Sequence, residues 1–315
     1  MENLDIWNSS LYPNQDLTLV KQALAYEQAS KSENTIRTYK SLWKGFVAWC
    51  ATEGIVSLPC SSEAICLYLS HLAPNVSRSM ISSVIASIEY MHKTAGVEIV
   101  GNPDRYRNVR KGIRRLHADK SIQHKAKALT ILDIALLGKL EASTLIDIRD
   151  RAIILLSFFG ALRRSEVVAL DIECVTITHQ GADIVLLKSK TSLDPVHIAI
   201  SRAHNPEVCP IKALETWIEA AQITSGPVFL SMNRHGRVNN KRLGPYQVRE
   251  IIIKRFGGEY SGHSCRRGLV TEEARRGISP YQIAKHSRHK DFNVLIGYVE
   301  QEQAFETSST KILGV

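Results

Sequence analysis

The densest basic stretch of the chain lies near its middle and separates two segments of different pattern. Its lysines and arginines are opposed only by Asp104 and Asp119. They are Arg105, Arg107, Arg110, Lys111, Arg114, Arg115, Lys120, Lys125 and Lys127. At 315 residues the chain is long enough for two domains, each with its own core. The polar run Ala118–Ser121 is typical of a linker, so we expect domains at 1–120 and 121–315.

Helical periodicity dominates the first domain. From Asn34 to Glu53 an apolar stripe recurs at alternating threes and fours, formed by Ile36, Tyr39, Trp43, Phe46 and Cys50. Arg37, Lys40 and Lys44 fall on a different face, which is either a solvated face or a surface for a polyanion. Further helices are expected at Ser62–His71 and Ser77–Thr94, and another that ends in the Arg110–Arg115 cluster. In Ser77–Thr94 we expect the buried stripe to be Met80, Val84, Ile88 and Met91.

The second domain mixes helices with a few short strands. The expected helices are Ile131–Glu141, Ile146–Gly160, Ile211–Ala221, Tyr246–Phe256, Arg266–Gly277 and Pro280–His286. Strand periodicity indicates Val175–Thr178, Ile184–Leu187 and Val196–Ile200. No internal repeat or low-complexity tract is present in the sequence.

The residues that carry chemistry follow one another in a fixed order through this domain. They are Arg163, Lys190, His263, Arg266, His289 and Tyr298, and His289 lies nine residues before Tyr298. A phosphodiester transition state spreads negative charge over its non-bridging oxygens, and arginine forks can bind two such oxygens without losing a proton. The order therefore indicates a tyrosine nucleophile, proton-transfer groups and cations around a phosphate.

Three of these segments resemble the boxes of the tyrosine recombinase (phage integrase) family. Leu162–Glu166 resembles the first arginine box, His263–Arg266 the second, and His289 with Tyr298 the third. The resemblance covers nearly the whole chain, more loosely before residue 120, and Cre-like and Xer-like members are the most similar. It implies a mainly helical, two-domain DNA clamp: an amino-terminal helical bundle that binds DNA, and a mostly helical catalytic domain with a small antiparallel β-sheet.

The resemblance also implies a role for each residue. Tyr298 would be the nucleophile, Arg163 and Arg266 would hold the scissile phosphate, and His289 would donate to a non-bridging oxygen. His263 would transfer protons near neutral pH. Lys190 would protonate the leaving 5′ oxygen, and Glu166 would brace the cations. Because the phosphotyrosine ester conserves the energy of the cleaved bond, neither a metal nor ATP is expected as a cofactor.

Several neighbours compete for these assignments. The family pattern selects Arg163 and Arg266 over Arg164 and Arg267, and the spacing selects His289 over His286. Lys188 lies two residues before Lys190, so it is an alternative general acid. Arg288 stands where many members of the family have glycine, either as another cation near the phosphate or as a solvated arginine at a helix start.

Composition agrees with a double-stranded DNA partner. The formal net charge is +9 with a pI near 9.2. Phosphate contacts by Arg37, Lys40, Lys44, Arg110, Lys111, Arg114 and Arg115 would add affinity without sequence information. The six cysteines show no Cys-x-x-Cys pairing, which indicates neither zinc nor a disulfide framework. No apolar run approaches a membrane span and no signal peptide begins the chain, so we expect a cytoplasmic, nucleoid-associated protein of bacterial, phage, plasmid or archaeal origin.

An apolar tail follows Tyr298, with Phe305, Ile312 and Leu313. In Cre-like recombinases the corresponding segment docks on a neighbouring protomer, which implies a homotetramer on inverted-repeat half-sites and a Holliday-junction intermediate. The alternatives are a type IB topoisomerase-like enzyme that relaxes DNA as a monomer, and a DNA-binding protein with an inactive site.

Overall fold

The computed structural model describes residues 18–19, 22, 25–26, 30–117, 126–187, 194–289 and 295–297. The chain divides into two compact units, Met1–His124 and Lys125–Val315, which are taken separately below. The boundary expected at residue 120 lies outside the described residues.

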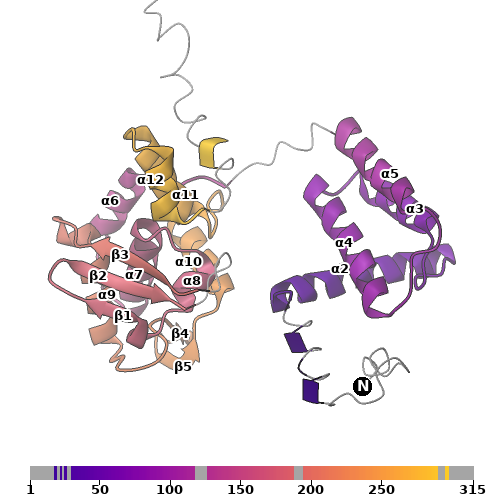
Figure 1. Ribbon diagram of the computed structural model, residues 1–315. Coiled ribbons are helices and arrows are strands. Elements are labelled where there is room, and N and C mark those ends of the chain that lie inside the picture. The colour runs from indigo at the N-terminus through magenta and orange to yellow at the C-terminus, as the bar shows by residue number, and fades with distance from the viewer. Residues whose placement is uncertain are drawn as a thin grey trace, which may run out of the picture. The chain divides into compact units, whose positions relative to one another are not determined.

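Unit 1 is a bundle of helices around an aromatic and aliphatic core (Figure 1). Its long helices are α2 (Glu33–Glu53), α3 (Ser62–Leu72), α4 (Arg78–Thr94) and α5 (Pro103–Leu116). The helices α2, α3 and α4 each begin after a serine whose hydroxyl accepts a backbone N–H of the first turn. The three helices expected with both bounds are confirmed to within one residue at each end, and α5 ends just after the Arg110–Arg115 cluster, as expected.

Two apolar faces of unit 1 illustrate how the periodicity translates into burial. In α2, Phe46 and Cys50 are buried, as their stripe predicted. In α4 the expected stripe is confirmed at Val84 and Ile88, which are buried, and is wrong at Met80, which is exposed. Ile81 and Ile85 complete the buried face. The β-branched residues take the core positions and the flexible methionine lies toward solvent.

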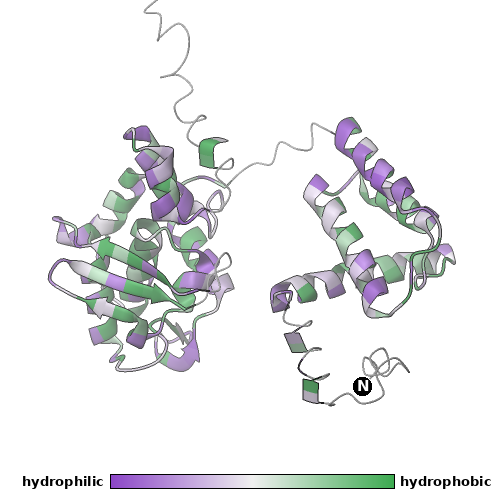
Figure 2. Cartoon of the chain, in the orientation of Figure 1, coloured by the Kyte–Doolittle hydropathy of each residue, from purple (hydrophilic) through white to green (hydrophobic). Residues whose placement is uncertain are grey.

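Helix α5 packs on the core through one face. Asn102 caps it, Pro103 occupies its first turn, and Tyr106 is its only fully buried side chain. Figure 2 shows hydrophilic residues over most of its surface. Val109 and Ile113 are partly buried and pack against the same core, so the basic cluster lies on a helix that has one packed face and one polar face.

Unit 2 is built around the apolar helix α7. The helices are α6 (Ile131–Lys139), α7 (Leu145–Phe159), α8 (Arg164–Val168), α9 (Pro210–Ala220), α10 (Pro245–Phe256), α11 (Ser264–Arg275) and α12 (Pro280–Ser287). Short 3-10 turns occur at Ile172–Cys174 and Pro206–Val208. The side chains from Ala152 to Leu156 are all fully buried, and the surrounding core includes residues of α9, α11 and the sheet (Figure 1).

One antiparallel sheet covers part of this core. Strands β1 (Val175–Ile177), β2 (Gly181–Leu186) and β3 (Val196–Ser201) pair in that order, with Ile184 opposite Ile198. A second hairpin, β4 (Leu230–Met232) with β5 (Val238–Arg242), was not expected from the sequence. Its strands are short, and β5 carries Asn239, Asn240, Lys241 and Arg242 without an alternating apolar face. The expected mainly helical fold with a small antiparallel sheet is confirmed.

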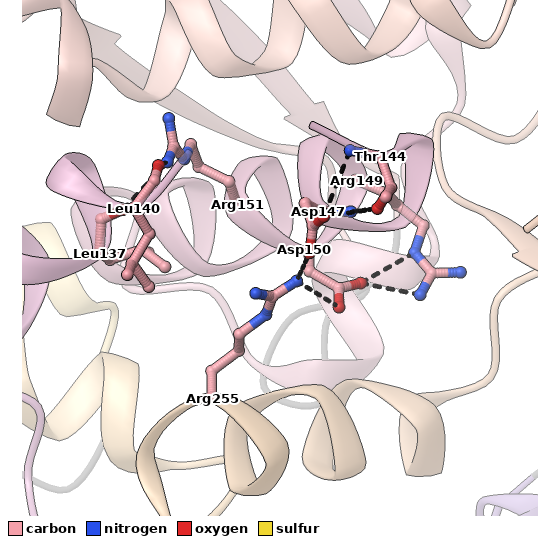
Figure 3. A network of polar contacts seen from close by, with 8 residues as sticks. All are labelled: Leu137, Leu140, Thr144, Asp147, Arg149, Asp150, Arg151 and Arg255. Atoms are coloured by element: carbon pink, nitrogen blue, oxygen red, sulfur yellow. Dashed lines mark hydrogen bonds and ion pairs between the residues drawn. The ribbon is translucent and has the colours of Figure 1, made fainter. Parts of the chain in front are cut away.

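A polar network fixes α7 to its neighbours (Figure 3). Arg255 of α10 binds Asp147 and Asp150 on α7, and Asp150 also receives two bonds from Arg149, at 2.7 and 3.1 Å. Arg151 donates to the carbonyls of Leu137 and Leu140 at the end of α6. These bonds fix the position of α7, which matters because the first arginine box begins where α7 ends.

Candidate active site

The first arginine box follows a tight turn at the end of α7. Gly160 caps the helix, Ala161 adopts a positive φ of 46°, and the Leu162 N–H returns to the Ser157 carbonyl at 3.1 Å. A left-handed conformation is unfavourable for alanine, so the local strain indicates a functional constraint. The turn places Arg163 at the amino-terminal cap of α8 and directs the Ala161 carbonyl toward the arginines described below.

Glu166 is the buried anion of the site. Its side chain is 2% exposed and accepts the Arg163 backbone N–H at 2.9 Å, the Arg163 guanidinium at 2.5 Å and the Arg288 guanidinium at 3.0 Å. Burial alone raises the pKa of this carboxyl, but the bonds from Arg163 and the charge of Arg288 outweigh it and lower the pKa below its ordinary value. Glu166 therefore stays ionised and balances part of the cationic charge.

Arg266 of α11 lies in the same cluster of charged side chains as Arg163, Glu166 and Arg288. The helix can approach because Gly268 faces the Leu129 carbonyl, at a distance where a Cβ atom would lie 2.1 Å from that oxygen. Arg266 is 5% exposed, and its Nη1 donates to the Ala161 carbonyl at 2.8 Å. Its Nη2 is buried without a hydrogen-bond partner among the described residues. Burial, followed by the charges of Arg163 and Arg288, lowers the pKa of Arg266 to about 9, so it remains a cation at neutral pH.

His289 follows the end of α12 and faces the same cations. Its Nδ1 lies 2.6 Å from the Ser287 hydroxyl, and that hydroxyl donates to the Ile283 carbonyl at 2.6 Å. Because the single hydroxyl proton is committed to Ile283, Nδ1 carries a proton and donates to Ser287, which leaves Nε2 to face a ligand. Burial, then Arg266, Arg163 and Arg288, lower the pKa of His289 to about 4.

Arg288 is a member of the site whose role the sequence did not settle. The alternative of a solvated arginine at a helix start is wrong, since Arg288 ends α12 and its side chain is 12% exposed. Its guanidinium donates to the carbonyls of Gly160 and Ala161, both at 3.0 Å. These partners lie more than a hundred residues earlier in the chain, so no local sequence signal could have identified them.

The remaining candidates divide between described and undescribed residues. His263 precedes α11 as its cap, three residues before Arg266, with its side chain exposed. Lys190, its alternative Lys188, and Tyr298 lie outside the described residues. Leu295, three residues before Tyr298, is fully buried with Val270, Ala274 and Ile283 of α11 and α12. The structure therefore brings together Arg163, Glu166, Arg266, Arg288 and His289.

The candidate DNA-contacting residues lie on two helices of unit 1. Arg37, Lys40 and Lys44 are exposed on α2, and Arg110, Lys111, Arg114 and Arg115 lie on α5, with Arg110 partly buried. Arg78 of α4 joins Lys111, Arg114 and Arg115 around a depression of about 270 Å³, and it donates to the Arg114 carbonyl at 3.3 Å. Sequence reasoning missed Arg78 because its neighbours come from another helix.

Neither a transmembrane helix nor a metal cluster is found in the described parts of the chain. No helix there is long and apolar enough to cross a membrane. Within the same ranges no three or more His, Cys, Asp or Glu side chains gather in a way that could hold a metal ion.

Unit 2 is mostly helical and holds three arginines near one buried carboxylate, with His289 facing the same arginines. Such a cationic cluster is suited to phosphodiester chemistry. The chain belongs to the Phage integrase family, which matches residues 130–304. It is 31% identical to the integrase/recombinase XerD homolog of Selenomonas ruminantium, an alignment that covers 96% of this chain and 92% of the relative.

Two further proteins are more distant. The chain is 22% identical to the Cre recombinase of Escherichia phage P1, over 85% of this chain and 84% of that protein. The Tn1549 transposon integrase in complex with transposon right-end DNA shares the fold, with a TM-score of 0.58, 13% identity, and coverage of 88% of this chain and 92% of that one. The expected tyrosine recombinase family of the Xer and Cre type is confirmed. The protein is thus a tyrosine site-specific recombinase that cleaves and rejoins DNA.

Proposed function

We propose that the cluster around Glu166 binds the scissile phosphate and that Tyr298 attacks it. The observation that carries the proposal is the unpaired Nη2 of Arg266, a buried charged donor beside Arg163 and His289. A buried cation that keeps an N–H without a partner is costly unless a ligand completes it. An oxygen of a phosphodiester supplies both the acceptor and the negative charge.

The proposed reaction combines this cluster with the roles that the family resemblance implies for Tyr298, His263 and Lys190. The Tyr298 hydroxyl attacks phosphorus, a P–O bond to tyrosine forms, and the bond to the 5′ oxygen breaks. His263 takes up the phenol proton, and Lys190 gives a proton to the departing oxygen. Arg163 and Arg266 meet the charge that develops on the non-bridging oxygens. Glu166 holds the Arg163 guanidinium, and the Ala161 carbonyl holds that of Arg266.

His289 needs a proton before it can donate to the phosphate through Nε2, because its Nδ1 proton is already given to Ser287. In the DNA-free protein its pKa is about 4, so the ring is neutral near pH 7. An adjacent phosphate favours the charged form and raises this pKa. We therefore propose that DNA binding protonates His289 and completes the set of cations.

Guanidinium groups supply the charge that a divalent ion would otherwise provide, so the proposal requires no cofactor. The test is single-turnover cleavage of a nicked half-site in excess EDTA. Arg163→Ala and Arg266→Ala should each slow cleavage by about 100- to 1,000-fold, as loss of one oxyanion donor does. Arg276→Ala is the matched control, since Arg276 lies on the surface at the end of the same helix as Arg266 and its guanidinium binds Glu272 in the part of the chain that the structure describes. Cleavage that stops in EDTA and returns with magnesium contradicts the proposal.

Unit 1 is proposed to bind the duplex through phosphate contacts. Two basic surfaces support this: Arg37, Lys40 and Lys44 on α2, and Arg110, Lys111, Arg114 and Arg115 on α5. The depression shared with Arg78 contains four cations and no acid. Replacing one of these cations should weaken half-site binding at all sequences and reduce its salt dependence by about one counterion per lost contact.

A neighbouring copy is the proposed partner of the tail, and the pair would assemble into a homotetramer on inverted-repeat half-sites. Unit 2 has a cavity of about 660 Å³ whose apolar lining includes Phe159, Ile198, Ile200 and Leu269. Its charged lining consists of one acid, Glu273, and the basic residues Arg202, Lys285 and Arg288, with His197 and His286 beside them. Glu273 is largely buried, and its Oε2 has no partner among the described residues. The segment Gln303–Val315 carries apolar side chains and Lys311, which suit such a cavity.

Deleting Gln303–Val315 should leave half-site affinity near normal and abolish cooperative filling of the second half-site, a coupling of about 1–3 kcal/mol. The charge exchange Glu273→Lys with Lys311→Glu should restore part of the cooperativity that each single change removes. Full cooperativity and recombination after the deletion would show that the tail does not couple protomers.

A further inference from the structure

Arg288 occupies a backbone conformation that an arginine rarely adopts. Its φ is 56°, in the left-handed region, and it follows the last turn of α12. Within the described ranges only Ala161 and Gln222 share this conformation among residues other than glycine. Glycine would take it without strain, so the arginine side chain must offset the cost through its own contacts.

Those contacts tie together three helix ends. Nη1 donates to the Gly160 carbonyl at 3.0 Å and the His286 carbonyl at 3.2 Å, and Nη2 donates to the Ala161 carbonyl and to Glu166 Oε2, both at 3.0 Å. One planar guanidinium therefore joins the end of α7, the start of α8 and the end of α12. The residue that follows it is His289.

The Ala161 carbonyl is shared with Arg266, which donates to it at 2.8 Å. The two arginines differ in whether their terminal nitrogens have protein partners. Both terminal nitrogens of Arg288 are occupied by protein groups, whereas Nη2 of Arg266 has no partner among the described residues. Arg266 therefore keeps a donor for a ligand, and Arg288 keeps none at its terminal nitrogens.

We infer that Arg288 is a positioning residue for strand cleavage: it fixes the Ala161 carbonyl that orients Arg266 and fixes the turn that presents His289. The inference rests on the phosphate-binding role proposed for Arg266 and His289. It also explains why this position is not glycine. The hydrogen bonds of the guanidinium offset the unfavourable backbone conformation. They form only when the first and third boxes lie together in the folded chain.

The charge of Arg288 supports this role. Three arginines act on His289: Arg266 of α11, Arg163 at the cap of α8, and Arg288, which precedes His289. Glu166 binds two of them, Arg163 and Arg288. All three arginines lower the pKa of His289, in addition to burial. Removing one of them should move the titration of His289 toward higher pH.

The test compares Arg288→Gly, Arg288→Lys and Gln222→Gly. Glycine preserves the left-handed backbone and removes the guanidinium, while lysine preserves the charge and loses the planar fork. Gln222→Gly relieves the same backbone conformation at a position after α9, with no part in the site. Each variant is measured for half-site affinity, single-turnover cleavage, thermal stability and the imidazole titration of His289 by NMR.

Arg288→Gly should bind the half-site within about threefold of the parent protein, cleave it about 10- to 100-fold more slowly, and titrate His289 at higher pH. Arg288→Lys should recover part of the cleavage rate and keep the titration near its original position, and Gln222→Gly should change neither. Cleavage by Arg288→Gly within twofold of the parent overturns the inference. If Arg266→Ala also cleaves normally, the proposed function itself fails; if Arg266→Ala is inactive, only the positioning role does.

Discussion

Glu166 is the carboxylate that pairs with Arg163 and Arg288 in the described part of the site. Replacing it therefore tests most sharply which bonds hold the site together. Three bonds to its oxygens disappear in Glu166→Ala, and Arg163 and Arg288 lose their counter-charge. Breaking a buried ion pair from one side costs about 3–5 kcal/mol. Glu166→Gln keeps an acceptor and the shape but not the charge, and we expect about 1.5–3 kcal/mol.

The matched control is Glu215→Gln. Glu215 pairs with Arg202 by two bonds in the same unit, but the two side chains are 34% and 31% exposed. Solvent screens such a pair, so its loss should cost less than about 1 kcal/mol. Denaturant unfolding of the full chain, followed by hydrogen exchange in peptides from 145–187, reports on unit 2 alone.

The pH dependence has a definite sign. Because the folded pKa of Glu166 is lowered, its stabilisation is present above the unfolded pKa of about 4.3 and is lost as pH falls through the folded value. The difference between the parent and Glu166→Gln should therefore shrink in acid. Equal costs for Glu166→Gln and Glu215→Gln at neutral pH would refute the reasoning.

Three further predictions concern residues around this centre. Lys190→Ala should cleave ordinary DNA slowly and a 5′-bridging phosphorothiolate at nearly the parent rate, because sulfur leaves without a proton; rescue of Lys188→Ala instead moves the assignment by two residues. Half-site binding should take up a proton and tighten as pH falls from about 7.5 to about 5, because the pKa of His289 is about 4 in the free protein and rises beside the phosphate; in calorimetry with two buffers of different ionisation enthalpy, absence of proton uptake would contradict this. Gly268→Ala should lower the free energy of unfolding by about 1–3 kcal/mol, because the new Cβ would lie 2.1 Å from the Leu129 carbonyl oxygen; an unchanged denaturation midpoint would show that α11 shifts without cost.

Much of this fold could be predicted because its helices and three-stranded sheet leave strong periodic patterns. Helix α7 follows from its apolar run, and β2 and β3 follow from their alternation. The β4–β5 hairpin could not be predicted, since its strands are short and largely polar. Burial within α4 was misjudged because Met80 and Ile81 satisfy the helical period almost equally, and only packing decides between them.

The site, too, could be predicted from the sequence only in part. Residue order identified Arg163, Arg266 and His289, which the structure brings together around Glu166. Arg288 was visible only as a departure from the family pattern. Its function depends on backbone carbonyls at Gly160 and Ala161, and such partners leave no trace in side-chain identity. Strained turns and carbonyl acceptors are properties of the folded chain.

Covalent attachment of DNA to Tyr298 tests the central claim most directly. A nicked suicide half-site is incubated with the full chain in excess EDTA, the adduct is digested, and the peptide that carries the 3′-phosphate is sequenced by mass spectrometry. The account predicts one modified residue, Tyr298, and no adduct with Tyr298→Phe despite normal half-site binding. An adduct on another residue, or one that persists in Tyr298→Phe, would contradict it.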